Sequence, residues 1–102
     1  DILDKTGRSP LHLAADRGHN DLVSLLLNKG LNKDAQDTKY GRTPLHYAAR
    51  AGHGAVVRTL MTNGANENVA DKAGKTPIQL AEEGGHRGLM TAMKHFRSAM
   101  ES

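Results

Sequence analysis

The sequence predicts an all-α repeat solenoid of stacked helix-turn-helix units with projecting β-hairpin-like fingers. Two observations carry this prediction: a block that recurs three times, and an apolar series at helical spacing behind each block. The blocks GRSPLHLAADRGH, GRTPLHYAARAGH and GKTPIQLAEEGGH begin at Gly7, Gly41 and Gly74 and align without a gap. Their starts lie 34 and 33 residues apart. A fixed period of this size is typical of folds built by stacking one small unit.

The first helix of each unit has clear start and stop signals. A hydroxyl residue that can cap a helix precedes a proline at the first helical position, in the pairs Ser9–Pro10, Thr43–Pro44 and Thr76–Pro77. A glycine, which tolerates the left-handed conformation of a helix end, follows about two turns later. These glycines are Gly18, Gly52 and Gly85. The sequence therefore predicts a short first helix in every unit.

The second helix of each unit is predicted from apolar residues at spacings of i, i+1, i+3 and i+4, which describe one helical face. The third unit has no glycine where Gly30 and Gly64 end the earlier second helices, so the last helix is expected to run on. An apolar stripe continues along it through Leu89, Met90, Met93, Phe96 and Met100. We interpret this stripe as core, the alternative being a docking surface for a partner.

The segments between units, LNKDAQDTKYG and ANENVADKAG, have the Asp, Asn and Gly content of turns and are expected to project as fingers. The first finger holds one extra residue, because Asp37 stands one position further from Gly41 than Asp71 does from Gly74. We expect a longer or bulged tip there. The extra residue is either a harmless insertion in a surface loop or part of a partner contact through Lys39 and an exposed Tyr40.

TPLHYAARAGH and SPLHLAADRGH resemble the ankyrin-repeat signature, and the period is that of the ankyrin family. The resemblance covers essentially the whole chain. It divides the sequence into the end of a preceding finger (1–6), repeat one (7–40), repeat two (41–73) and a C-terminal capping repeat (74–102). In the third repeat, Gln79 replaces the TPLH histidine and Glu82 replaces the second alanine of the pair. Polar substitutions of this kind are expected where no further repeat covers the outer side.

Repeat one shows no such polar substitutions. Its apolar positions are those expected of an internal repeat. Asp1 to Asp4 also align with Asn68 to Asp71, the end of a later finger. We therefore expect the sequence to be the C-terminal part of a longer array, monomeric as a fragment.

Composition excludes several classes of site and leaves the core to small aliphatic residues. The chain is 37% hydrophobic but only 3% aromatic, so Leu, Val, Ala and Met must fill the core. Cysteine is absent, which excludes disulfides and thiolate metal sites. No apolar stretch approaches the roughly 20 residues of a membrane span. Neither a Gly-x-Ser-x-Gly elbow nor a phosphate-binding Gly-rich loop occurs, so we expect no enzyme activity and no cofactor.

Five of the six histidines recur with the repeat. His12 and His46 belong to the PLH motif, and His19, His53 and His86 occur once per repeat. A zinc site needs several ligands within about 2.0–2.3 Å of one ion, whereas histidines one repeat apart stay separated. The resemblance implies structural hydrogen bonds for these side chains, and we expect no metal site. His95 is expected on the solvent side of the last helix.

Candidate binding residues form two strips, because equivalent positions of stacked repeats line up on the surface. The first is a basic finger edge, where the residue after each signature glycine and each finger tip are basic: Lys5, Arg8, Lys39, Arg42, Lys72 and Lys75. Aspartates at 4, 37 and 71 dilute this charge, and the resemblance suggests that they support the turns. The second strip, at the end of each first helix on the concave side, contributes Arg17 and Arg50.

The resemblance implies an intracellular module, cytoplasmic or nuclear, that binds a protein or peptide through its finger tips and concave surface. It directs attention to Arg17, Arg50, Lys39, Tyr40 and Arg42. Because Tyr40 and Arg42 are both placed on a surface finger, replacing them together is expected to leave thermal stability nearly unchanged.

Two alternatives stay open at this point. The basic edge is a possible site for an acidic partner such as nucleic acid or anionic lipid, although the net charge is only +3. We do not expect nucleic-acid binding, because no aromatic stacking series and no basic helix accompany that edge. The other alternative is a regulatory domain of a larger enzyme or channel, which is compatible with protein binding.

Overall fold

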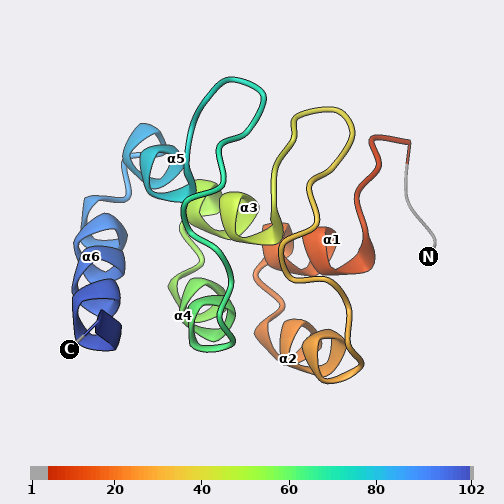
Figure 1. Ribbon diagram of the computed structural model, residues 1–102, viewed down its shortest axis with the longest axis horizontal. Coiled ribbons are helices and arrows are strands. Elements are labelled where there is room, and N and C mark those ends of the chain that lie inside the picture. The colour runs from red at the N-terminus through yellow and green to blue at the C-terminus, as the bar shows by residue number, and fades with distance from the viewer. Residues whose placement is uncertain (1–4, 102) are drawn as a thin grey trace.

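Three pairs of helices, joined by two finger-like loops, make up the protein (Figure 1). The computed structural model describes residues 5–101. Over that range it contains six helices and no strand: α1 (Pro10–Arg17), α2 (Asn20–Asn28), α3 (Pro44–Ala51), α4 (Gly54–Thr62), α5 (Pro77–Glu83) and α6 (Arg87–Glu101). The predicted all-α repeat solenoid is confirmed. Asp1 to Asp4 and the side chain of Met100, on which two of the predictions rest, lie outside the described part.

All three first helices begin where the sequence signals predict, and α1 and α3 also end there. Helix α5 instead ends at Glu83 with Gly84 as its C-cap, one residue before the predicted Gly85. In α3, the Thr43 side chain accepts a hydrogen bond from the backbone N–H of His46, and Pro44 occupies the first turn. Gly52 ends this helix with a φ of 81°, in the left-handed region that favours glycine. In α1, Ser9 and Gly18 do the same.

The helices form two layers. The first helices stack in the order α1, α3, α5, so that α3 lies between its two neighbours, and α2, α4 and α6 form the second layer (Figure 1). Alanines fill the contacts of the first layer, and Ala15, Ala48, Ala49 and Ala81 are fully buried. Leucine and valine from both layers complete one continuous core that runs through all three repeats.

The last helix is extended, as the missing glycine predicts. It has 15 residues, whereas α2 and α4 have 9 each. Met93 is 2% exposed, and Leu89 and Phe96 pack against the core. These three positions of the apolar stripe therefore belong to the core. His95 is exposed, as expected.

The extra residue of the first finger changes the turn at its tip. In the second finger the Gly74 N–H donates to the carbonyl of Asp71, three residues earlier, at 2.9 Å. In the first finger the Gly41 N–H reaches the carbonyl of Asp37, four residues earlier, at 3.1 Å. The insertion is thus absorbed by a wider turn at the tip. No helix within residues 5–101 combines the length and the apolar character that crossing a membrane requires.

Candidate functional site

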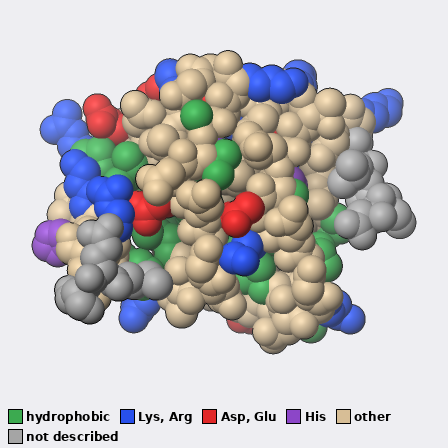
Figure 2. Space-filling model, in the orientation of Figure 1, with side chains coloured by type: hydrophobic (Ala, Val, Ile, Leu, Met, Phe, Trp, Pro, Cys, Tyr) green, Lys and Arg blue, Asp and Glu red, His purple; other side chains and the backbone are tan. Residues whose placement is uncertain are grey.

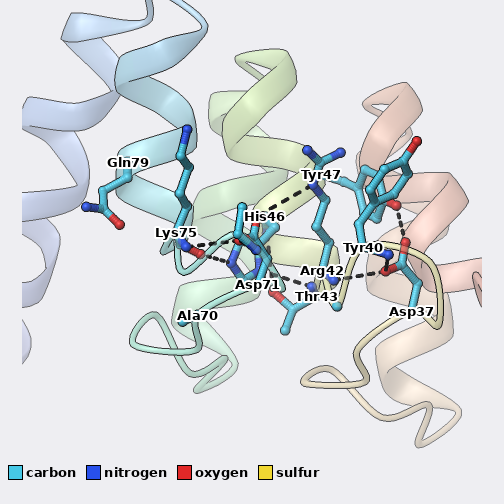
Figure 3. A network of polar contacts seen from close by, with 12 residues as sticks. Asp37, Tyr40, Arg42, Thr43, His46, Tyr47, Ala70, Asp71, Lys75 and Gln79 are labelled. Atoms are coloured by element: carbon cyan, nitrogen blue, oxygen red, sulfur yellow. Dashed lines mark hydrogen bonds and ion pairs between the residues drawn. The ribbon is translucent and has the colours of Figure 1, made fainter.

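The histidines of the PLH motif fasten α1 and α3 to the neighbouring finger segments, as Figure 3 shows for His46. Nδ1 of His46 accepts a hydrogen bond from the Thr43 N–H at 3.0 Å, and Nε2 lies 2.8 Å from the carbonyl oxygen of Lys75. Because Nδ1 accepts from a backbone N–H, the proton belongs on Nε2, which then donates. His12 is held in the same way, with Nε2 at 2.7 Å from the carbonyl of Ala35. These are structural hydrogen bonds, as the resemblance implied.

Burial of these two imidazoles sets their charge. Desolvation lowers the pKa of both His12 and His46, and the backbone carbonyls that face their Nε2 atoms only partly oppose that shift. Neutral rings are therefore favoured at neutral pH, in agreement with the one-donor, one-acceptor pattern of the hydrogen bonds.

Asp37 and Asp71 hold the finger turns, which confirms for these two the role that the resemblance suggested; Asp4 lies outside the described residues. Oδ1 of Asp37 accepts from the N–H groups of Tyr40 at 3.1 Å and Arg42 at 2.9 Å. Oδ1 of Asp71 accepts from the Lys75 N–H at 2.9 Å. Asp37 also accepts a hydrogen bond from the Tyr47 hydroxyl group, and burial is the main cause that raises the pKa of that phenol (Figure 3). The finger bases are therefore fixed by buried polar contacts.

Neighbouring fingers are joined by backbone hydrogen bonds. The N–H groups of Thr38 and Lys39 donate to the carbonyl of Thr6 at 3.1 and 3.2 Å. One repeat further on, the Lys72 N–H donates to the carbonyl of Tyr40 at 2.9 Å. The Lys72 ammonium group donates to the Thr38 carbonyl. Finger tips from successive repeats are thus held in register and form one edge.

The predicted binding residues fall into two groups. Six are exposed: Lys5, Arg17, Lys39, Tyr40, Arg50 and Lys72. Three are only half-exposed: Arg8, Arg42 and Lys75. Figure 2 shows Lys and Arg side chains along the edge where the fingers project. Arg17 is the last residue of α1, and Arg50 is the last but one of α3, which packs against α1. The two arginines therefore lie near corresponding helix ends of neighbouring repeats, one position apart in the repeat alignment.

Arg42 is part of the finger base, and its placement on an open surface is wrong. Its side chain is 18% exposed, and Nε lies 3.8 Å from Oδ2 of Asp71. The guanidinium carbon lies 4.6 Å from the ring centre of Tyr40 and 5.6 Å from that of Tyr47 (Figure 3). Arg42 is thus held between an aromatic ring of the finger and an aromatic ring of α3. Its contact with a partner stays a prediction.

Tyr40 is the exposed aromatic residue of the finger edge. Its side chain is 40% exposed, and the Lys39 ammonium nitrogen lies 5.2 Å from its ring centre. With Arg42 also against the ring, cation–π contacts favour one orientation of the phenol. Tyrosine and arginine are among the residues that most often contribute a large share of the binding free energy at protein interfaces.

The histidines of the second and third Gly-His steps connect neighbouring repeats. Nε2 of His53 lies 3.0 Å from the carbonyl of Asp16, and Nε2 of His86 lies 3.1 Å from that of Arg50. Each ring therefore contacts the end of the preceding first helix. Within residues 5–101, no group of three or more His, Asp or Glu residues could hold a metal ion.

Two contacts were missed by sequence reasoning. Tyr47 replaces the aliphatic residue found at this position in the other repeats, Leu13 and Leu80, and this difference is the signal that could have indicated its bond to Asp37. The second is a hydrogen bond across the second layer, from the Thr59 hydroxyl group to Oδ1 of Asn20 at 2.7 Å.

A family model described as ankyrin repeats, with three copies, matches residues 1–71. The chain belongs to the ankyrin-repeat family. Ankyrin repeats are in general protein–protein interaction modules, and the family is in general non-catalytic. Residues 72–102 lie beyond the match, and there the helices α5 and α6 continue the ankyrin stack as its third pair.

Proposed function

We propose that this ankyrin domain is a non-catalytic scaffold that binds a protein or peptide carrying acidic groups through its finger edge and concave surface. The observation that carries the proposal is the group formed by Lys39, Tyr40 and Lys72 at the finger tips. All three are exposed, and the backbone hydrogen bond between Lys72 and Tyr40 joins the two fingers that carry them. Little conformational entropy is lost when a partner docks on such a preorganised edge.

Arg17 and Arg50 provide a second set of contacts. Both are exposed at the ends of their helices, and the carbonyls of Asp16 and Arg50 are bound by the histidines of the next repeat. The backbone that carries the two guanidinium groups is therefore fixed, while the groups themselves are available for carboxylates. Arginine and tyrosine are the residue types enriched at binding hot spots.

A protein partner is favoured over nucleic acid or anionic lipid by the ion pairs of the finger edge. Arg42 faces Asp71 and Lys75 pairs with Glu83, so carboxylates already neutralise two of the basic groups on the edge. Phosphate recognition needs several free cations and produces a steep dependence on salt. A regulatory role within a larger enzyme or channel is compatible with protein binding. An intracellular location and a monomeric state stay predictions.

The test compares three forms of the domain as bait: the unchanged chain, the variant Lys39→Ala/Tyr40→Ala, and the control variant Arg58→Ala/Lys94→Ala. The control removes exposed basic residues from α4 and α6, away from the fingers. Quantitative pull-down from cell lysate should recover a protein with the unchanged and control baits, at about tenfold lower yield with the finger variant. Equal capture by all three baits would contradict the proposed surface. Capture that nuclease treatment abolishes would indicate the nucleic-acid alternative.

A further inference from the structure

The first repeat exposes large apolar side chains on one side of α2. Leu22 is 41% exposed and Leu25 is 49% exposed. At the position equivalent to Leu22 in the second repeat, Val56 is 1% exposed. Figure 1 shows no helix of the described chain beyond α1 and α2 on the side away from α3 and α4. Leu22 and Leu25 are thus exposed to solvent, whereas Val56, the equivalent of Leu22 in the second repeat, is buried.

The later repeats show which way this side faces. The Thr59 hydroxyl group bonds to Asn20, so the equivalent of Leu25 in α4 faces the preceding helix, α2. In α6, the equivalents of Leu22 and Leu25 are Leu89 and Ala92, and both line a hollow shared with Val57 and Met61 of α4. The Leu25 position in the second repeat and both positions in the third therefore face the second helix of the preceding repeat.

His19 gives an independent sign of the same missing neighbour. Its equivalents, His53 and His86, each contact a carbonyl at the end of the preceding first helix. His19 is exposed and, among residues 5–101, has no such partner. It borders an open hollow lined by residues 18–22. Two exposed leucines and a histidine that, among the described residues, lacks the hydrogen bond of its equivalents therefore lie on the same side of the first repeat.

We propose that His19, Leu22 and Leu25 form a stacking surface for one further ankyrin repeat, carried ahead of residue 1 in the same polypeptide. The second helix of that repeat covers Leu22 and Leu25, and its first helix ends with a carbonyl that accepts from His19. The surface is continuous with the contacts between α2 and α4 and between α4 and α6. This inference does not depend on the proposed binding function.

A second copy of this chain fits the surface less well. A two-fold dimer would set α2 against α2, and neither copy would present a first-helix end to the other's His19. A head-to-tail dimer would use the outer side of the last repeat, whose helices expose Glu82, Glu83, Arg87 and Lys94. Charged side chains are poor partners for two leucines.

The test builds the missing neighbour from the chain's own second repeat. Residues 41–67 are copied in front of Asp1, which restores the 33-residue period because residues 1–6 align with 68–73. The substitutions Leu22→Gln/Leu25→Gln are then made in both the extended and the 102-residue chain. Thermal unfolding should show a higher Tm for the extended chain, and a loss from the double substitution about 5 °C larger there than in the 102-residue chain.

The control pair, Arg58→Gln/Thr62→Gln, changes exposed residues of α4 and should shift the two chains equally. In the natural polypeptide, the sequence ahead of residue 1 should contain a Gly-His step about 33 residues before His19. Absence of that step, or equal losses in both chains, would overturn the proposal. So would a concentration-dependent dimer of the 102-residue chain that the two leucine substitutions dissociate, since the occupant would then be a second copy.

Discussion

Gly52 lies against the ring of His86, which links the third repeat to the second through a hydrogen bond. Replacing Gly52 by alanine tests that contact. Its φ is 81°, and an added Cβ would lie 2.6 Å from Cε1 and 2.8 Å from Nδ1 of His86. No side chain fits at that separation, so the imidazole must move. The movement breaks the hydrogen bond between His86 Nε2 and the Arg50 carbonyl, which is 3.1 Å long.

Gly30 is the matched control for this substitution. Its φ is 86°, and an added Cβ would meet no atom within 4 Å. Gly30→Ala therefore carries only the cost of a left-handed alanine, about 1–2 kcal/mol. Gly52→Ala adds the lost hydrogen bond, about 0.5–1.5 kcal/mol. We expect Gly52→Ala to be the more destabilising of the two by about 1 kcal/mol.

Urea unfolding followed by circular dichroism measures both free energies on the 102-residue chain. In a His86→Ala background, no imidazole is left to be displaced, so Gly52→Ala should cost no more than Gly30→Ala. Equal destabilisation by the two glycine substitutions in the unchanged background would refute the claim that His86 links the repeats through this contact.

Three further outcomes follow from the packing and the polar network. Leu60→Ala should lower the free energy of unfolding by about 2–5 kcal/mol, because this fully buried leucine would leave a cavity; urea titration measures the loss. Arg42→Ala should cost about 1–2 kcal/mol through lost cation–π and ion-pair contacts, whereas Tyr40→Ala should change stability by less than that in the same assay. The lowered pKa of His12 and His46 means that the unfolded chain takes up protons first as the pH falls below about 6.5. The free energy of unfolding therefore keeps this contribution above that pH and loses it as the pH falls. The double substitution His12→Gln/His46→Gln should flatten the dependence of the free energy of unfolding on pH between pH 7 and 5. A profile as steep as that of the unchanged chain would argue against buried neutral rings.

The repeat architecture could be predicted because its signals are local. A hydroxyl cap, a proline and a glycine at fixed spacing determine a short helix wherever it lies, and α3 from Pro44 to Ala51 has the predicted bounds. The extended last helix followed from a missing glycine. The histidine and aspartate hydrogen bonds followed from the resemblance, since their partners lie at fixed repeat positions.

The candidate site was less predictable because the exposure of a finger side chain depends on contacts with residues elsewhere in the chain. Sequence position places Arg42 and Lys39 on the same finger, yet one packs between two rings and the other is open. The contact of Tyr47 with Asp37 joins residues on a helix and on a finger, and the sequence signals it only through the departure of Tyr47 from the leucine of the other two repeats. Side chains that pair across elements require the tertiary arrangement before their burial can be assigned.

The most direct test of the binding account is the affinity of a partner recovered in the pull-down, measured by calorimetry against the unchanged domain, the Lys39→Ala/Tyr40→Ala variant and the Arg58→Ala/Lys94→Ala control. If the finger tips form the binding surface, the finger variant raises Kd about tenfold or more while the control keeps the Kd of the unchanged domain. Equal Kd values for the finger variant and the unchanged domain, with all three proteins folded, would contradict it.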